Sequence, residues 1–136
     1  MKICLIIDEA STISCKPVII LFLKVEDFFS PPTIFVALVE LEKQDAETIC
    51  CSVLETLNNI GFTNNYLQKN LVGFCSDGAS VMLGRKSGMS TRITNQFPNI
   101  IIWHCLNHRI QLVLDDAINS VKQVNHFKIF KKLPEL

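Results

Sequence analysis

Two apolar runs of strand length, each followed by an aspartate, constrain the fold of this chain most. The first covers residues 3–7 and precedes Asp8; the second covers residues 71–76 and precedes Asp77. Near-continuous apolar runs are typical of central strands buried on both faces of a sheet. Open α/β sheets bind their ligands at the carboxyl ends of such strands. The two aspartates are therefore the first candidate site residues.

The rest of the chain predicts an alternation of strands and helices. We expect strands at 18–25, 33–41 and 100–103, helices at 46–60, 87–97 and from 106 onward, short helical turns at 63–69 and 78–80, and a turn at 9–16. Asp45 is the expected N-cap of the first helix and Gly61 its stop. The order β-β-β-α-β-α-β-α predicts an α/β fold of the ribonuclease H-like class. Its five-stranded mixed sheet, in the order 3-2-1-4-5 and flanked by helices, would place Asp8 beside Asp77.

Composition narrows the class of protein further. The chain has 136 residues, of which 49% are hydrophobic, and 13 Lys+Arg balance 13 Asp+Glu. This length suits one domain, and the composition excludes intrinsic disorder and a polybasic protein. The sequence contains no run long enough to span a membrane and no signal peptide pattern. The six cysteines form no C-x-x-C pair, so we expect reduced, mostly buried thiols in a nuclear or cytoplasmic protein.

Asp8 and Asp77 form a candidate metal site. Two neighbouring carboxylates repel each other unless a cation lies between them. Mg²⁺ and Mn²⁺ prefer such oxygen ligands, and in nucleases these ions activate the attacking group and stabilise the leaving oxygen. The alternative is that each acid only caps the turn after its strand.

The segment from Cys75 to Gly88 is a candidate phosphate-binding element. Gly78 lies between a strand and a helical turn, where backbone amides can meet a phosphate. Arg85 and Lys86 add local positive charge in the basic, flexible loop at 84–88. The alternative is a glycine-rich surface loop with two solvated cations.

A third motif lies at the junction of the last strand and helix. Cys105 and His108 are three residues apart, and Arg109 follows. A zinc site would need a second Cys/His pair, and a nucleophilic dyad would need an orienting partner. The simplest alternative is a packed cysteine with a histidine near the helix N-terminus.

Together these segments resemble the ribonuclease H-like core of hAT-superfamily transposases. The stretches that carry the resemblance are LIIDEASTIS, GFCSDGASVMLGRKSG and WHCLNHRIQLVLDDAI, in this order and spacing. The resemblance extends to domesticated vertebrate members, including one described as a SUMO-protein ligase. It implies that Asp8 and Asp77 are the first two metal-binding acids. It also implies that His108 is the histidine of the C-x-x-H motif, near the active site and the DNA.

The chain departs from the family in ways that bear on activity. The family's third acid is a glutamate after a long helical insertion, and Asp115, Asp116 and Glu135 do not match it. We therefore expect an incomplete core at 1–125 and a basic tail at 126–136. Its ancestral chemistry would be metal-dependent DNA cleavage and strand transfer, now without catalysis. The alternatives are an exapted nuclear interaction module linked to SUMO conjugation and a small active nuclease.

Two expectations concern partners. Because the chain is neutral, Arg85, Lys86 and Arg109 would supply any attraction to DNA, which would be weak and non-specific. The strand at 33–41 would form an unguarded apolar edge, so we also expect a protein partner or a homo-oligomer.

Overall fold

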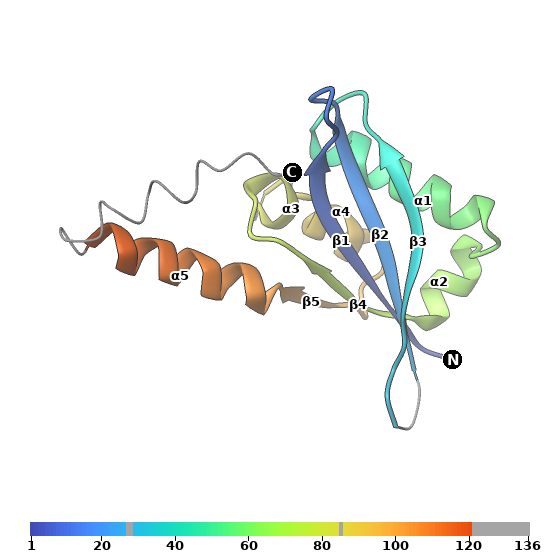
Figure 1. Ribbon diagram of the computed structural model, residues 1–136. Helices are drawn as coiled ribbons and strands as arrows, with labels where there is room; N and C mark the ends of the chain where they lie inside the picture. The colour runs from blue at the N-terminus through green and yellow to red at the C-terminus, as the bar shows by residue number, and fades with distance from the viewer. Residues whose placement is uncertain (27–28, 85, 121–136) are drawn as a thin grey trace. The chain divides into compact units, whose positions relative to one another are not determined.

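The computed structural model describes residues 1–26, 29–84 and 86–120, and it divides the chain into two compact units. The first, Met1–Cys105, contains the sheet; the second, Leu106–Leu136, contains the helix α5 (Leu106–Ser120) (Figure 1). The boundary expected between residues 125 and 126 lies outside the described residues. The division into a core and a tail therefore stays a prediction.

The first unit is built on one mixed sheet. Its strands are β1 (Ile3–Ser11), β2 (Pro17–Val25), β3 (Thr33–Glu40), β4 (Leu71–Ser76) and β5 (Ile101–His104). They lie in the order β3-β2-β1-β4-β5. β1 and β2 are antiparallel, as are β2 and β3, whereas β4 runs parallel to both β1 and β5. The predicted α/β fold with its five-stranded sheet is confirmed, and the topology is consistent with a ribonuclease H-like fold.

Helices of the first unit cover one face of this sheet (Figure 1). They are α1 (Ala46–Asn59), α2 (Asn64–Asn70), α3 (Ser80–Leu83) and α4 (Met89–Gln96). The core lies between the two layers, where alternate strand residues such as Leu5, Leu21 and Phe74 are fully buried. Ile49 of α1 and Ile93 of α4 pack in the same cluster. None of the described helices of this unit lies on the opposite face of the sheet (Figure 1).

The helix α1 begins and ends as its sequence predicts. The Thr48 amide donates to Oδ1 of Asp45 over 2.9 Å, and the Thr48 hydroxyl donates to Oδ2 over 2.8 Å. These bonds stabilise the ionised carboxylate, so the pKa of Asp45 is lowered from its ordinary value of 3.8. At the other end Gly61 adopts φ +102°, a conformation that suits glycine.

The turn expected at residues 9–16 is shorter than the sequence indicates. β1 continues to Ser11, which pairs with Pro17 across a tight connection. In that connection Cys15 has φ 59°, and the Thr12 amide donates to the Lys16 carbonyl over 2.9 Å. Pairing with the apolar β2 therefore overrides the polar composition of Glu9 to Ser11. Asp8 consequently lies within the hairpin rather than at its end.

The expectation of mostly buried cysteines is wrong. All six are free thiols, but only Cys50 is buried, while Cys15 and Cys51 are exposed. Cys51 follows Cys50 on α1 and so lies off the face that packs against the sheet.

The second unit, as far as it is described, is the single helix α5. Its apolar side chains include Ile110, Val113 and Leu114, each at least half exposed. Of the helices described here, none combines the length and the apolarity needed to cross a membrane.

Candidate functional site

The candidate site is formed where β1 and β4 run side by side. These parallel strands pair at Cys4↔Gly73, Leu5↔Phe74 and Ile6↔Cys75, after which the ladder ends. Continued for two residues, the same register sets Asp8 against Asp77. Because side chains alternate along a strand, both acids follow Ile6 and Cys75 on the face away from the helices. Asp8 is exposed, whereas Asp77 is half-buried.

Asp77 also has a local structural role. Its Oδ1 accepts from the Ala79 amide over 3.3 Å, and the Ser76 hydroxyl donates to the Asp77 carbonyl over 3.1 Å. The aspartate therefore caps the turn that leads into α3, as the alternative interpretation of the sequence requires. This hydrogen bond engages one of the two carboxylate oxygens, so capping and cation binding are compatible roles.

Glu9 is a third acid of this region, and sequence reasoning missed it. Burial raises the pKa of the Glu9 carboxyl, and the negative charges of Asp77 and Asp8 raise it further. Its Oε1 is buried and has no hydrogen-bond partner among the described residues. The adjacent acids Asp8 and Glu9 are a sequence signal for this residue. However, the polar residues that follow predicted a turn there, so Glu9 was not a candidate site residue. When ionised, Glu9 adds its negative charge to those of Asp8 and Asp77 at this end of the sheet.

The electrostatics of these acids favour a cation without defining a complete metal centre. The negative charges of Asp77 and Asp8 add to the burial that raises the pKa of the Glu9 carboxyl, and a bound cation would relieve this repulsion. Within the described ranges, however, no group of three or more His, Cys, Asp or Glu side chains is arranged to hold a metal ion. The geometry thus offers the pair Asp8 and Asp77 as candidate ligands, whereas Glu9, the next residue along β1, lies on the opposite face of the sheet. Hard cations such as Mg²⁺ or Mn²⁺ match this oxygen donor set.

His104 lies beside the candidate site, at the carboxyl end of β5. It pairs with Ser76 of β4, and the amide of Cys105 donates to the Ser76 carbonyl over 2.9 Å. The imidazole also packs against the backbone of Gly78. The sequence pointed to Cys105 and His108 in this segment rather than to His104, because only the strand pairing reveals which residue lies next to the Asp77 turn.

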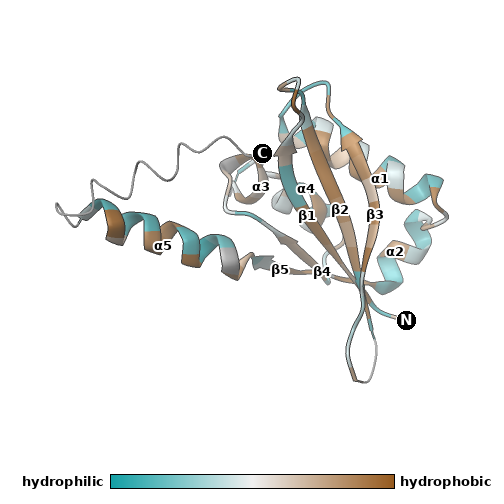
Figure 2. Cartoon of the chain, in the orientation of Figure 1, coloured by the Kyte–Doolittle hydropathy of each residue, from teal (hydrophilic) through white to brown (hydrophobic). Residues whose placement is uncertain are grey.

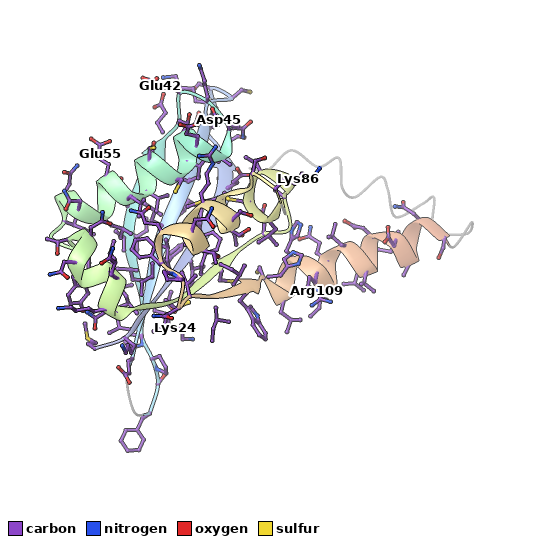
Figure 3. The ribbon with its side chains drawn as sticks, turned by 180° about the vertical axis from the view of Figure 1, so that it is seen from behind. Lys24, Glu42, Asp45, Glu55, Lys86 and Arg109 are labelled. Carbon is purple, nitrogen blue, oxygen red and sulfur yellow. The ribbon has the colours of Figure 1, made fainter. Side chains whose placement is uncertain are left out.

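Two hydrogen bonds end on the carbonyl of Gly84, at the start of the basic loop at 84–88, and the flexibility of this loop stays a prediction. The Gly88 amide donates to the Gly84 carbonyl over 2.9 Å, and the Thr91 hydroxyl donates to the same carbonyl over 3.1 Å. Gly88 is buried against the Gly84 backbone, leaving no room for a side chain. Lys86 is exposed on this loop (Figure 3), whereas Arg85 lies outside the described residues. Contact with phosphate stays a prediction.

An open cavity lies between the first turns of α1 and α4. It has a volume of about 580 Å³ and is lined by Asp45, Glu47, Gly88 and Arg92 among others. The Arg92 guanidinium contacts the Glu47 carboxylate over 3.4 Å. Its lining carries both signs of charge and includes neither Asp8 nor Asp77. The cavity is therefore separate from the carboxylate pair.

The remaining predicted residues belong to the second unit or to its border. α5 begins at Leu106, which places His108 in its first turn, as expected, and leaves Cys105 in the first unit. His108 is half-buried and Arg109 is exposed (Figure 3). Their roles toward DNA and toward the acids stay predictions.

No known family model matches the chain, and no curated protein matches it either.

Proposed function

We propose that this chain is a ribonuclease H-like core derived from an hAT transposase, in which Asp8 and Asp77 retain a weak divalent-cation site. One observation carries the proposal: the parallel pairing of β1 and β4, whose register sets Asp8 against Asp77. The three sequence motifs support it independently, because they fall on β1, on the β4–α3 junction and on the β5–α5 junction. A nuclear location follows from an origin in DNA transposition.

The chemistry of such a site is metal-assisted phosphoryl transfer. A cation held by two carboxylates can polarise a phosphodiester and lower the pKa of a bound water. Firm binding of two metal ions needs more ligands than two carboxylates alone can supply. We therefore propose that the ancestral cleavage has been lost while cation binding persists.

Manganese titration tests the cation site. Mn²⁺ bound to the chain is counted by electron paramagnetic resonance for the wild type and for D8N and D77N. Asparagine preserves side-chain shape, and at position 77 its oxygen can still accept from the Ala79 amide. We expect weak binding that falls at least several-fold in both variants. D116N, an exposed acid of α5, is the matched control and should bind as the wild type does. Equal binding in all four proteins would refute the site.

Nicking of supercoiled DNA tests the lost chemistry. We expect no cleavage by the purified chain in Mg²⁺ or Mn²⁺. Metal-dependent nicking that disappears in D77N would instead identify a small active nuclease.

A second candidate function is a protein-interaction module with a link to SUMO conjugation. The exposed apolar side chains of β3 favour it, since Phe35 is 59% and Leu38 is 56% exposed. In this case D8N and D77N would leave partner binding unchanged. Partner binding that needs Mn²⁺ and both acids would refute this second function.

A further inference from the structure

The strand β3 is an edge of the sheet and has neither an interior charge nor a proline. It pairs with β2 on one side, and no described strand lies on its other side. Its only ionisable residue is Glu40, at its last position, and it contains no proline. Natural sheets protect edges with interior charges, prolines or β-bulges, since unpaired N–H and C=O groups bind any strand that fits, and of these three devices β3 has only a bulge. The outer edge of β3 therefore presents a row of backbone N–H and C=O groups that pair with no described strand.

The side chains of β3 are also apolar and exposed. Ile34 is 48%, Phe35 is 59% and Leu38 is 56% exposed. The Phe35 ring packs edge-on against Phe22 of β2, with centroids 5.9 Å apart. The apolar side chains thus continue from the edge strand onto β2, and both strands are coloured mostly as hydrophobic (Figure 2).

A β-bulge restricts which strand can fit this edge. Phe35 pairs with Phe22 and Ala37 with Leu21, so Val36 is an extra residue. As a result Phe35 and Leu38, three residues apart, lie on one face, because their partners Phe22 and Ile20 do. In a regular strand, residues three apart would lie on opposite faces. Residues opposite each other in a strand pair must share a face.

We propose that β3 pairs with β3 of a second copy of the chain, antiparallel about a twofold axis. The bulge selects the register, since only Phe35 opposite Leu38 of the second copy, with Ile34 opposite Val39, matches faces over all eight residues of β3. An isologous contact of this kind closes, so it gives a dimer and not a fibre. The two sheets join into one continuous sheet.

Charge at the ends of the pair agrees with this register. Glu40 lies opposite Thr33 of the second copy, and Thr33 pairs with the exposed Lys24 on β2. Each Glu40 carboxylate, which contacts the Lys16 ammonium of its own chain, can therefore also approach the opposite charge of Lys24 of the second copy across one strand. The two Glu40 side chains lie at opposite ends of the pair, about 24 Å apart along the strands at ~3.4 Å per residue.

The other edge of the sheet is a poorer partner. β5 has only four residues, half the length of β3. Pairing of β3 with β5 of another copy would satisfy fewer backbone groups, and it would continue as an open fibre instead of closing.

Sedimentation velocity of the full chain over a range of concentrations tests the dimer. We expect a reversible monomer–dimer equilibrium, with a dissociation constant in the micromolar range because the contact is small. L38K places an ammonium group opposite Phe35 and should weaken the dimer at least tenfold. I101K makes the same kind of change at a residue of β5 that is 67% exposed, and it should dimerise as the wild type does.

Two further measurements keep the test decisive if L38K folds poorly. In the wild type, hydrogen exchange of the β3 amides should slow as concentration rises, while that of the β5 amides should not. E40K should weaken the dimer, and adding K24E should restore it. A monomer at every concentration, equal loss in L38K and I101K, growth into fibres, or protection confined to β5 would each overturn the proposal.

Discussion

The imidazole of His104 lies so close to Gly78 that a Cβ atom at position 78 would stand 2.5 Å from its Nε2. Glycine is thus required here by a neighbour on another strand, not by backbone conformation. Gly78 belongs to the turn that Asp77 caps, so this contact ties the end of β5 to the candidate site.

Substituting Gly78 tests this contact. G78A should destabilise the chain by about 1–3 kcal/mol, because the ring or the turn must move to admit the methyl group. In an H104A background the same change should cost far less, since the space is then free. Chemical denaturation of the four proteins gives the coupling directly. G61A is the control: nothing lies within 4 Å of its added Cβ, so only its φ of +102° opposes it. Its cost should be the same with and without His104.

The acids should show opposite effects on stability and on cation binding. E9Q removes a partly buried charge that is repelled by Asp8 and Asp77, so without metal its melting temperature should rise. The same change should weaken Mn²⁺ binding, because the potential at the site becomes less negative. E55Q removes an exposed charge from α1 (Figure 3) and should change neither quantity. An E9Q variant that melts lower than the wild type would contradict the repulsion.

The cap of α1 should make stability depend on pH. The pKa of Asp45 is lowered in the folded chain from 3.8, so the carboxylate stabilises the fold above that pH. This contribution is lost as pH falls through the folded pKa. D45N retains an oxygen for the Thr48 amide but carries no charge. The melting temperature of D45N should therefore be lower than that of the wild type at pH 7, with the difference shrinking as the pH falls through the folded pKa of Asp45. A constant difference would show that the charge is irrelevant.

Binding of DNA should be weak and should depend on the loop at 84–88. We expect dissociation constants of ~10⁻⁴–10⁻⁶ M at physiological salt, without sequence preference. Changing Arg85 and Lys86 together to alanine should weaken binding and flatten its salt dependence, because fewer counterions are released. H108A should leave the salt dependence of DNA binding nearly unchanged. Titrations at several salt concentrations decide the point, and an unchanged slope in the double variant would remove this loop from the interface.

The elements that the sequence predicted best are those with local signals. The apolar run before Asp8, the Asp45 cap and the Gly61 stop each depend on neighbouring residues, and the structure confirms all three. The strand order was also predictable, because three strands followed by alternating helices and strands leave few arrangements.

What the sequence could not predict depends on contacts between distant segments. Glu9 belongs to a strand only because β2 pairs with it, and its closeness to Asp77 follows from the pairing of β1 with β4. His104 reaches Gly78 through the pairing of β4 with β5. The Thr91 hydroxyl reaches back to the Gly84 carbonyl. These contacts join residues for which no motif or periodic spacing in a single sequence indicates that they come together.

Asp8 and Asp77 are positioned by different strand pairings, and this difference has a consequence for folding kinetics. Asp8 lies in a hairpin of neighbouring strands, which can form early, whereas Asp77 arrives only when β4 docks on β1 after α1 and α2. We therefore expect the carboxylate pair to assemble late, by a non-local step. A cation bound by both acids would add stability that is absent from the transition state, and such stability slows unfolding without speeding folding. Stopped-flow kinetics with and without Mn²⁺ should therefore differ in the unfolding limb alone.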